Sequence, residues 1–134
     1  MDATFADLPM EKLNELSYTA RGAAFKVYNQ LGPGLLESIY TACLIDELKT
    51  KGLFVESEVS VPVTYKGKRL DKEFKIDILV EKALVIEVKS VDDLTPLHRA
   101  QALSYLKLSG LKLGLLINFN TTDMTKSIRR IINK

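Results

Sequence analysis

Two short runs of alternating apolar residues, separated by a three-residue turn, constrain the fold of this chain more than any other feature. The apolar positions are Ile76, Ile78 and Val80 in the first run and Leu84, Ile86 and Val88 in the second. Period-two alternation is typical of a β-strand with one buried face. We therefore expect a β-hairpin that turns at Glu81-Lys82-Ala83.

The length of the turn predicts the register of the hairpin. A three-residue turn places Val80 opposite Leu84 and Ile76 opposite Val88, so that all six apolar side chains share one face. A two-residue turn would instead pair apolar residues with charged ones, because a slip of one residue reverses the face of every side chain.

The other face of this hairpin carries charge. In the same register Asp77 lies opposite Glu87, and Lys75 lies opposite Lys89. Two carboxylates that face each other repel, so a raised pKa, a nearby cation or a bound metal ion must offset the repulsion. A hard divalent cation with oxygen ligands suits such a pair. The alternative is an ordinary solvated sheet face.

The remaining segments predict an α/β domain. Apolar periodicity indicates helices at about 11–31 and 36–51, a strand at 54–65 and a turn at 66–69 before the hairpin. After the hairpin we expect a helix from Thr95 to Ser109, an apolar strand at 113–119 and a final helix. That last helix would begin at Thr121 or Thr122 and carry Met124, Ile128, Ile131 and Ile132.

Topology follows from these elements. Pro62 lacks a backbone donor, which favours an edge position for its strand. A right-handed crossover would lay strand 113–119 parallel to the strand that bears Glu87. With 134 residues, we expect one domain over 1–134 with its core at about 11–133.

Composition excludes several classes of protein. A net charge of +2 does not by itself indicate a nucleic-acid-binding protein. One cysteine, Cys43, and an N-terminus without signal-peptide features predict a cytoplasmic protein. No run approaches the roughly 20 apolar residues of a membrane span, so we expect no membrane partner.

A second candidate site element is the segment Gly34–Tyr40. Glu37 and Tyr40 are three residues apart and share one helix face. Alternatively, Glu37 is a first-turn acid that interacts favourably with the helix dipole, and Tyr40 packs in the core. Gly32-Pro33-Gly34 suggests an anion site, but it lacks the lysine and the spacing of a P-loop.

A third element is the stripe formed by His98, Gln101 and Tyr105 on one helix face. Such a stripe could bind a phosphate backbone or orient a metal site; the alternative is a half-buried polar edge. His98 is the only histidine, so a Cys–His or Ser–His–Asp site would have to use it, and a zinc site lacks ligands.

Basic residues precede the hairpin, at Lys66, Lys68, Arg69, Lys72 and Lys75. They could bind phosphates. A solvated hairpin explains them equally well, because Asp71 and Glu73 dilute the charge.

Together these motifs resemble the GxxExxY protein family, a branch of the PD-(D/E)XK nuclease superfamily. Asp77 and Glu87-Val88-Lys89 are similar to the D…ExK core, and Gly34, Glu37 and Tyr40 to the naming motif. His98, Gln101 and Tyr105 are similar to the histidine and QxxxY element of RecB-like nucleases, and Gly114–Phe119 to the last core strand. The resemblance covers about Ala20 to Asn120.

The resemblance implies a restriction-endonuclease-like core: a three-stranded antiparallel meander with a parallel fourth strand, flanked by helices. Asp77, Glu87 and the Val88 carbonyl would bind Mg²⁺ or Mn²⁺, and Glu37 would approach this site directly or through water. Lys89 would position and polarise the attacking water. Gln101 and Tyr105 would support the site or contact the substrate phosphate. The substrate contacts would be Lys75, His98, Tyr40, Lys68 and Arg69.

We therefore expect a metal-dependent nuclease that acts on nucleic acid, with DNA as the substrate. One alternative is a catalytically silent module that binds nucleic acid or protein through the same groove. Another is a structural dimer subunit with a vestigial site. A domain of this size covers little of a duplex, which makes a homodimer plausible.

Overall fold

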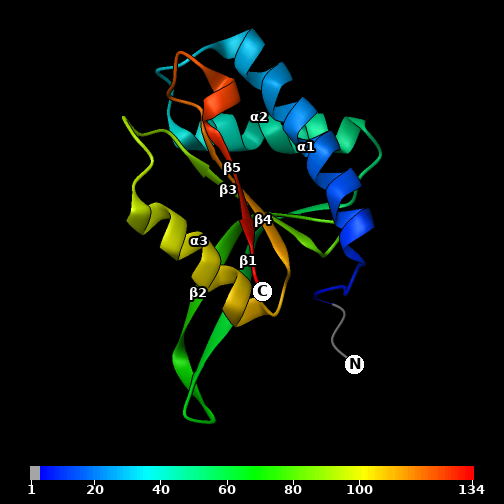
Figure 1. Cartoon of the computed structure of the whole chain (residues 1–134), viewed down its shortest axis with the longest axis vertical. Coiled ribbons are helices and arrows are strands. Elements are labelled where there is room, and N and C mark those ends of the chain that lie inside the picture. Colours follow the sequence, from blue (N-terminus) through cyan, green and yellow to red (C-terminus); the bar gives the residue numbers. More distant parts are fainter. Residues whose placement is uncertain (1–3) are drawn as a thin grey trace.

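A five-stranded sheet with helices on both faces forms the centre of the molecule (Figure 1), and the computed structural model describes residues 4–134. The strands lie side by side in chain order. The elements are α1 Met10–Leu31, α2 Glu37–Thr50, β1 Val55–Tyr65, β2 Lys68–Val80, β3 Leu84–Lys89, α3 Pro96–Ser109, β4 Leu113–Asn118, the 3₁₀ turn η1 Met124–Lys126 and β5 Ile128–Ile132. Residues 1–3, part of the N-terminus searched for a signal peptide, lie outside the described residues.

The hairpin of β2 and β3 has the predicted turn and register near that turn. Val80 pairs with Leu84, and Ile78 pairs with Ile86. The predicted pairing of Ile76 with Val88 and of Lys75 with Lys89 is wrong, because the backbone ladder ends at Ile78. The two strands separate beyond this point.

A kink in the neighbouring strand accompanies this separation. Glu58 of β1, which lies across from Asp77, has a positive φ of 49°, a conformation that non-glycine residues rarely adopt. Ile76 consequently packs on the sheet face opposite to Ile78. The expectation that six apolar residues share one face therefore holds for five: Ile78, Val80, Leu84, Ile86 and Val88.

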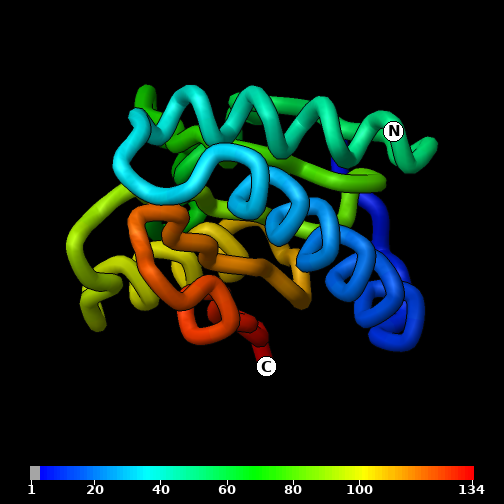
Figure 2. Tube along the Cα trace, turned by 90° about the horizontal axis from the view of Figure 1, so that it is seen from above, coloured from blue at the N-terminus to red at the C-terminus, as the bar shows by residue number. Residues whose placement is uncertain are grey.

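Two apolar clusters cover the two faces of the sheet. The larger one lies under α1 and α2, which neighbour each other in Figure 2, and contains Tyr40, Leu44 and Phe119. The smaller one lies under α3 and contains Ile76, Leu79, Val85, Ala102 and Leu106. A strand covered on both faces has no polar side, which explains why every residue of β4 is buried.

The predicted ends of the first three helices are confirmed within a residue or two. Gly52 after α2 has a φ of 80° and Gly110 after α3 a φ of 75°, the left-handed conformation that ends many helices. Pro62 lies in the edge strand β1, at a shift in its register with β2. β3 and β4 run parallel, as the crossover predicted.

The predicted C-terminal helix is wrong. Residues 124–126 form the turn η1, capped by Asp123, and residues 128–132 form β5, antiparallel to β4. Ile128 and Ile131 are three apart, which fits a helix as well as a strand. β-branched residues favour the strand, and without β5 the edge of the buried strand β4 would have no hydrogen-bond partners.

None of the helices in residues 4–134 is long and apolar enough to cross a membrane.

Candidate active site

The centre of the site lies where β2 and β3 separate. The main-chain amide of Val88 donates a hydrogen bond to Oδ2 of Asp77, 2.9 Å away. The main-chain amide of Asp77 points at Oε1 of Glu87 across 3.4 Å. Side-chain oxygens thus take the place of strand partners just beyond the last ladder pair, and they hold two carboxylates at one opening of the sheet.

Glu87 is a carboxylate in an unfavourable environment. Its side chain is 4% exposed. Burial first, and then the negative charge of Asp77, raise the pKa of Glu87 to about 9, while Lys89 acts in the opposite direction. Without a further cation this carboxyl group therefore keeps its proton at neutral pH, and a cation beside the pair would favour the charged form.

Helix α3 brings two of the predicted residues to this centre. Nζ of Lys89, at the end of β3, lies 3.5 Å from Oε1 of Gln101. One turn further along α3, burial and the charges of Glu87 and Asp77 raise the pKa of Tyr105. Lys89, Gln101 and Tyr105 therefore border the carboxylate pair.

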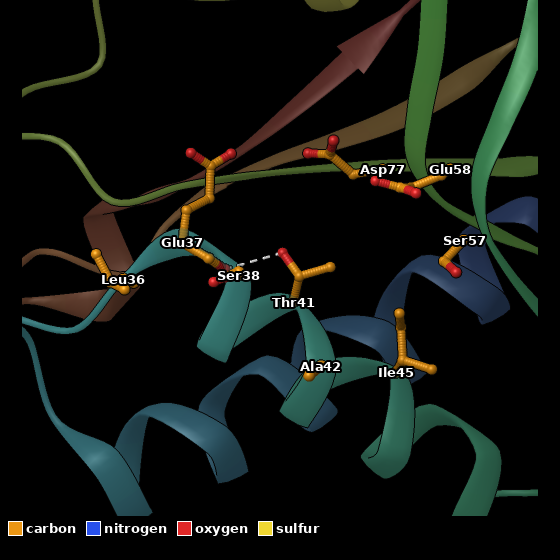
Figure 3. A pocket seen from close by; sticks show the side chains of 9 residues that line it. All are labelled: Leu36, Glu37, Ser38, Thr41, Ala42, Ile45, Ser57, Glu58 and Asp77. Carbon is orange, nitrogen blue, oxygen red and sulfur yellow. Dashed lines mark hydrogen bonds between the residues drawn. The ribbon is translucent and has the colours of Figure 1, made fainter.

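Glu37 approaches from the start of α2. Figure 3 shows its side chain and that of Asp77 at the same opening. Burial raises the pKa of Glu37; Lys89 and His98 lower it and Asp77 raises it. These charges place Glu37 within electrostatic reach of the centre.

A cavity of about 590 Å³ opens beside these carboxylates. Apolar side chains of Leu36, Ala42 and Ile45 line it together with polar ones. The lining residues are Leu36, Glu37, Ser38, Thr41, Ala42, Ile45, Ser57, Glu58 and Asp77.

Tyr40 occupies a different place from the predicted substrate contact. Its side chain has no exposed surface, and its ring stacks on Phe119 with centroids 4.6 Å apart. The hydroxyl donates to the Gly32 carbonyl at 2.6 Å and accepts from the Leu35 amide at 3.1 Å. Tyr40 thus fixes the loop that leads into Glu37 and presents no surface to a substrate.

His98 caps helix α3. Its Nδ1 accepts a hydrogen bond from the Thr95 amide at 3.0 Å, and its own amide donates to Oγ1 of Thr95 at 3.2 Å. This reciprocal pair is a capping box, here with histidine in the place that glutamate or glutamine usually takes.

The three basic candidates on β2 are not brought to the centre. Lys75, Lys68 and Arg69 are exposed. Lys75 is two residues from Asp77, but Lys68 pairs with Tyr65, seven residues along β1 from the position across from Asp77, about 23 Å at the rise of an extended chain.

The geometry supports only part of the predicted set of metal ligands. Within residues 4–134, no group of three or more His, Cys, Asp or Glu side chains could hold a metal ion. Glu37 therefore does not join Asp77 and Glu87 in a ready-made cluster. The carboxylates of that pair and the Val88 carbonyl are nonetheless hard oxygen donors, a set that suits Mg²⁺ or Mn²⁺ and not a soft metal.

Sequence reasoning missed two supporting residues. Phe74 of β2 stacks on Tyr105 with ring centroids 4.2 Å apart. Asn118, 4% exposed, accepts from the Val91 amide at 3.1 Å and donates to the Val91 carbonyl at 2.9 Å. It fixes the loop that follows β3. The signal for Asn118 was one polar residue at the end of an apolar strand; Phe74 gave none.

Comparison with known proteins identifies the family of this chain. A sequence model described as the PD-(D/E)XK nuclease superfamily matches residues 14–131. A solved structure titled "Crystal structure of SSO0001" is similar, with 25% sequence identity and a TM-score of 0.56 over 72% of this chain. This chain covers 49% of that one, about half its length. No curated protein matches. The fold is restriction-endonuclease-like, and the chain belongs to the PD-(D/E)XK nuclease superfamily.

Proposed function

We propose that this protein is a metal-dependent nuclease that hydrolyses phosphodiester bonds in DNA. The observation that carries the proposal is the pair Asp77 and Glu87, held together through the Val88 amide with Lys89 beside them. Membership of the nuclease superfamily supports it. The motif Gly34, Glu37 and Tyr40, and the Gln101–Tyr105 spacing on α3, support placement in the GxxExxY branch related to RecB-like nucleases.

Asp77, Glu87 and the Val88 carbonyl are the proposed ligands of Mg²⁺ or Mn²⁺. The cation would neutralise phosphate charge and lower the pKa of a bound water. The proton that Glu87 keeps at neutral pH in the metal-free protein, because of its raised pKa, would leave when the cation binds.

The surrounding side chains have separate tasks in this proposal. Lys89 holds the attacking water by a hydrogen bond from its ammonium group. The water oxygen bonds to phosphorus as the bond to the leaving ester oxygen breaks; the water gives a proton to solvent, and the leaving oxygen takes one from solvent. Gln101 holds the Lys89 ammonium in place. Glu37 orders water on the opposite wall of the cavity, and Tyr40 positions Glu37 through the loop it binds.

Cleavage of labelled single-stranded, duplex and branched DNA tests the proposal, with Mg²⁺ or Mn²⁺ and with chelator. We expect metal-dependent cleavage that disappears in Asp77→Ala and Lys89→Ala but persists in Lys51→Ala, which removes an exposed lysine at the far end of α2. Salt-sensitive DNA binding without cleavage would instead indicate a silent binding module. Absence of both would remove the proposal.

A further inference from the structure

The far part of the β1–β2 hairpin is an arm that projects beyond the rest of the sheet (Figure 1). We define the arm as residues 64–75. Every residue in it is exposed except Phe74, which is half-buried. β3 pairs with β2 only from Ile78 onward, so the arm has no third strand. An isolated two-stranded ribbon is marginally stable in water, and its length therefore needs an explanation outside the core.

Positive charge is concentrated in this arm. It contains five basic and two acidic side chains, a net charge of +3, whereas the whole chain has +2. The rest of the protein is thus slightly acidic. A local basic stripe on a nearly neutral protein is the footprint expected of a phosphate-binding surface.

The register of the arm sorts its charges between the two faces. Val61 pairs with Phe74 and Tyr65 pairs with Lys68, so strand alternation places these residues on the same face. Val61 and Phe74 belong to the cluster under α3. Glu73, which pairs with Pro62, projects from the other face, so Lys68 lies on the side of α3. Lys72 lies at the shift in register between these pairs, where alternation assigns no face, and its side chain is exposed.

An aromatic contact joins the root of the arm to the candidate active site. The rings of Phe74 and Tyr105 stack at 4.2 Å with an interplanar angle of 10°. Tyr105 in turn lies within the electric field of Glu87 and Asp77. The root of the arm is therefore packed against the helix that borders the carboxylate pair.

We propose that the arm binds the backbone of duplex DNA about seven base pairs from the phosphate held in the active site, with Lys68 and Lys72 as the contacts. This proposal rests on the proposed nuclease function. Lys68 pairs with Tyr65, seven residues along β1 from Glu58, which lies across from Asp77. Seven residues of strand span about 23 Å, which corresponds to about seven base pairs.

A ligand that spans the distance between the arm and the active site must be rigid, which favours duplex DNA over a single strand. A duplex stays straight over this distance, because its persistence length is about 150 base pairs. Surfaces that bind single strands stack successive bases on several aromatic side chains. The arm offers one exposed aromatic ring, Tyr65, and that ring already carries the Lys66 ammonium at 5.5 Å from its centroid.

Affinity for duplexes of increasing length tests this proposal, measured by fluorescence anisotropy with Mg²⁺ in the Asp77→Asn background to prevent cleavage. We expect the affinity to rise once the duplex extends about seven base pairs to one side of the bound phosphate. Lys68→Ala/Lys72→Ala should remove this rise, weaken long duplexes roughly tenfold and reduce the salt slope by about 2. The control Lys12→Ala/Lys51→Ala has the same charge change at an exposed position of α1 and at the exposed C-cap of α2 and should leave the rise intact.

The possible outcomes distinguish failure of the arm proposal from failure of the nuclease proposal. Long-duplex affinity that is equal in the arm variant and the control would overturn the arm proposal and leave the nuclease proposal standing. Equal binding of single-stranded and duplex DNA, equally weakened by the arm variant, would overturn the duplex as ligand. Failure of the Asp77→Asn protein to bind DNA of any form, together with no cleavage by the wild type, would overturn both.

Discussion

The Asp77 carboxylate accepts a hydrogen bond from the Val88 main-chain amide across 2.9 Å, where a strand partner would otherwise lie. The bond gives one side chain two tasks. It completes the backbone hydrogen bonding of β3 beyond the last ladder pair, and it fixes the position of a candidate metal ligand. The two tasks can be separated because the first needs an acceptor and the second needs a negative charge.

We predict that Asp77→Asn and Asp77→Ala both abolish cleavage but differ in stability. Asparagine keeps an oxygen that can accept from the Val88 amide, so the free energy of unfolding should stay near that of the wild type. Alanine leaves a buried amide without a partner and should cost about 1–3 kcal/mol. Urea denaturation of both variants, without metal, measures the difference; equal stability of the two variants would show that the bond contributes nothing.

The raised pKa of Glu87 predicts how the stability of the metal-free protein depends on pH. The folded state holds the Glu87 proton up to about pH 9, whereas the unfolded chain loses it near 4.5. Stability from this group is therefore fully present below the lower value and falls as pH rises towards the upper one, by at most about 1.4 kcal/mol per pH unit. Glu87→Gln should be more stable than the wild type in this window and equal to it at its acidic end.

A divalent cation should reverse the sign of that comparison. Added Mg²⁺ binds the folded wild type and stabilises it by mass action, but Glu87→Gln lacks the charge that binds it. Thermal unfolding with and without Mg²⁺, at the two ends of the pH window, provides the measurement. A Glu87→Gln protein that gains as much from Mg²⁺ as the wild type would exclude Glu87 as a ligand.

The hairpin that carries the site was predictable because its turn length left one register consistent with both apolar runs. Residues up to Ile78 obey that register. The departure at Ile76 coincides with the left-handed conformation of Glu58 in the neighbouring strand. Nothing in the local sequence indicates it, since glutamate is not a residue that favours this conformation.

The C-terminal strand was not predictable from its own residues. The spacing of Ile128 and Ile131 suits either element, and the choice depends on β4, which needs a partner on its free edge. The same limit applies to side chains in the site. Sequence spacing placed Gln101 and Tyr105 on one helix face. It could not show that Tyr40 and His98 form hydrogen bonds with the backbone and not contacts with a substrate.

We predict that Tyr40→Phe lowers both stability and cleavage. The substitution removes the hydroxyl that binds the Gly32 carbonyl and the Leu35 amide, at a cost of about 1 kcal/mol, and loosens the loop before Glu37. Tyr28→Phe is the matched control, because its hydroxyl donates to the Thr121 carbonyl at 2.6 Å. It should lose similar stability without losing cleavage at a temperature where both variants are folded. Equal effects on cleavage would mean that Tyr40 acts through stability alone.

His98 can be assigned either to the cap of helix α3 or to contact with the substrate. Its Nδ1 is already bound to the Thr95 amide, so we assign it to the cap. Glutamine at this third helical position also completes a capping box; His98→Gln should therefore keep both the melting temperature and KM. His98→Ala should lose about 1 kcal/mol of stability. Steady-state cleavage and thermal melting of both variants test this assignment. A rise in KM in both variants, with a changed melting temperature only in His98→Ala, would instead assign His98 to the substrate. Only the loss of a substrate contact can raise KM without destabilising the helix.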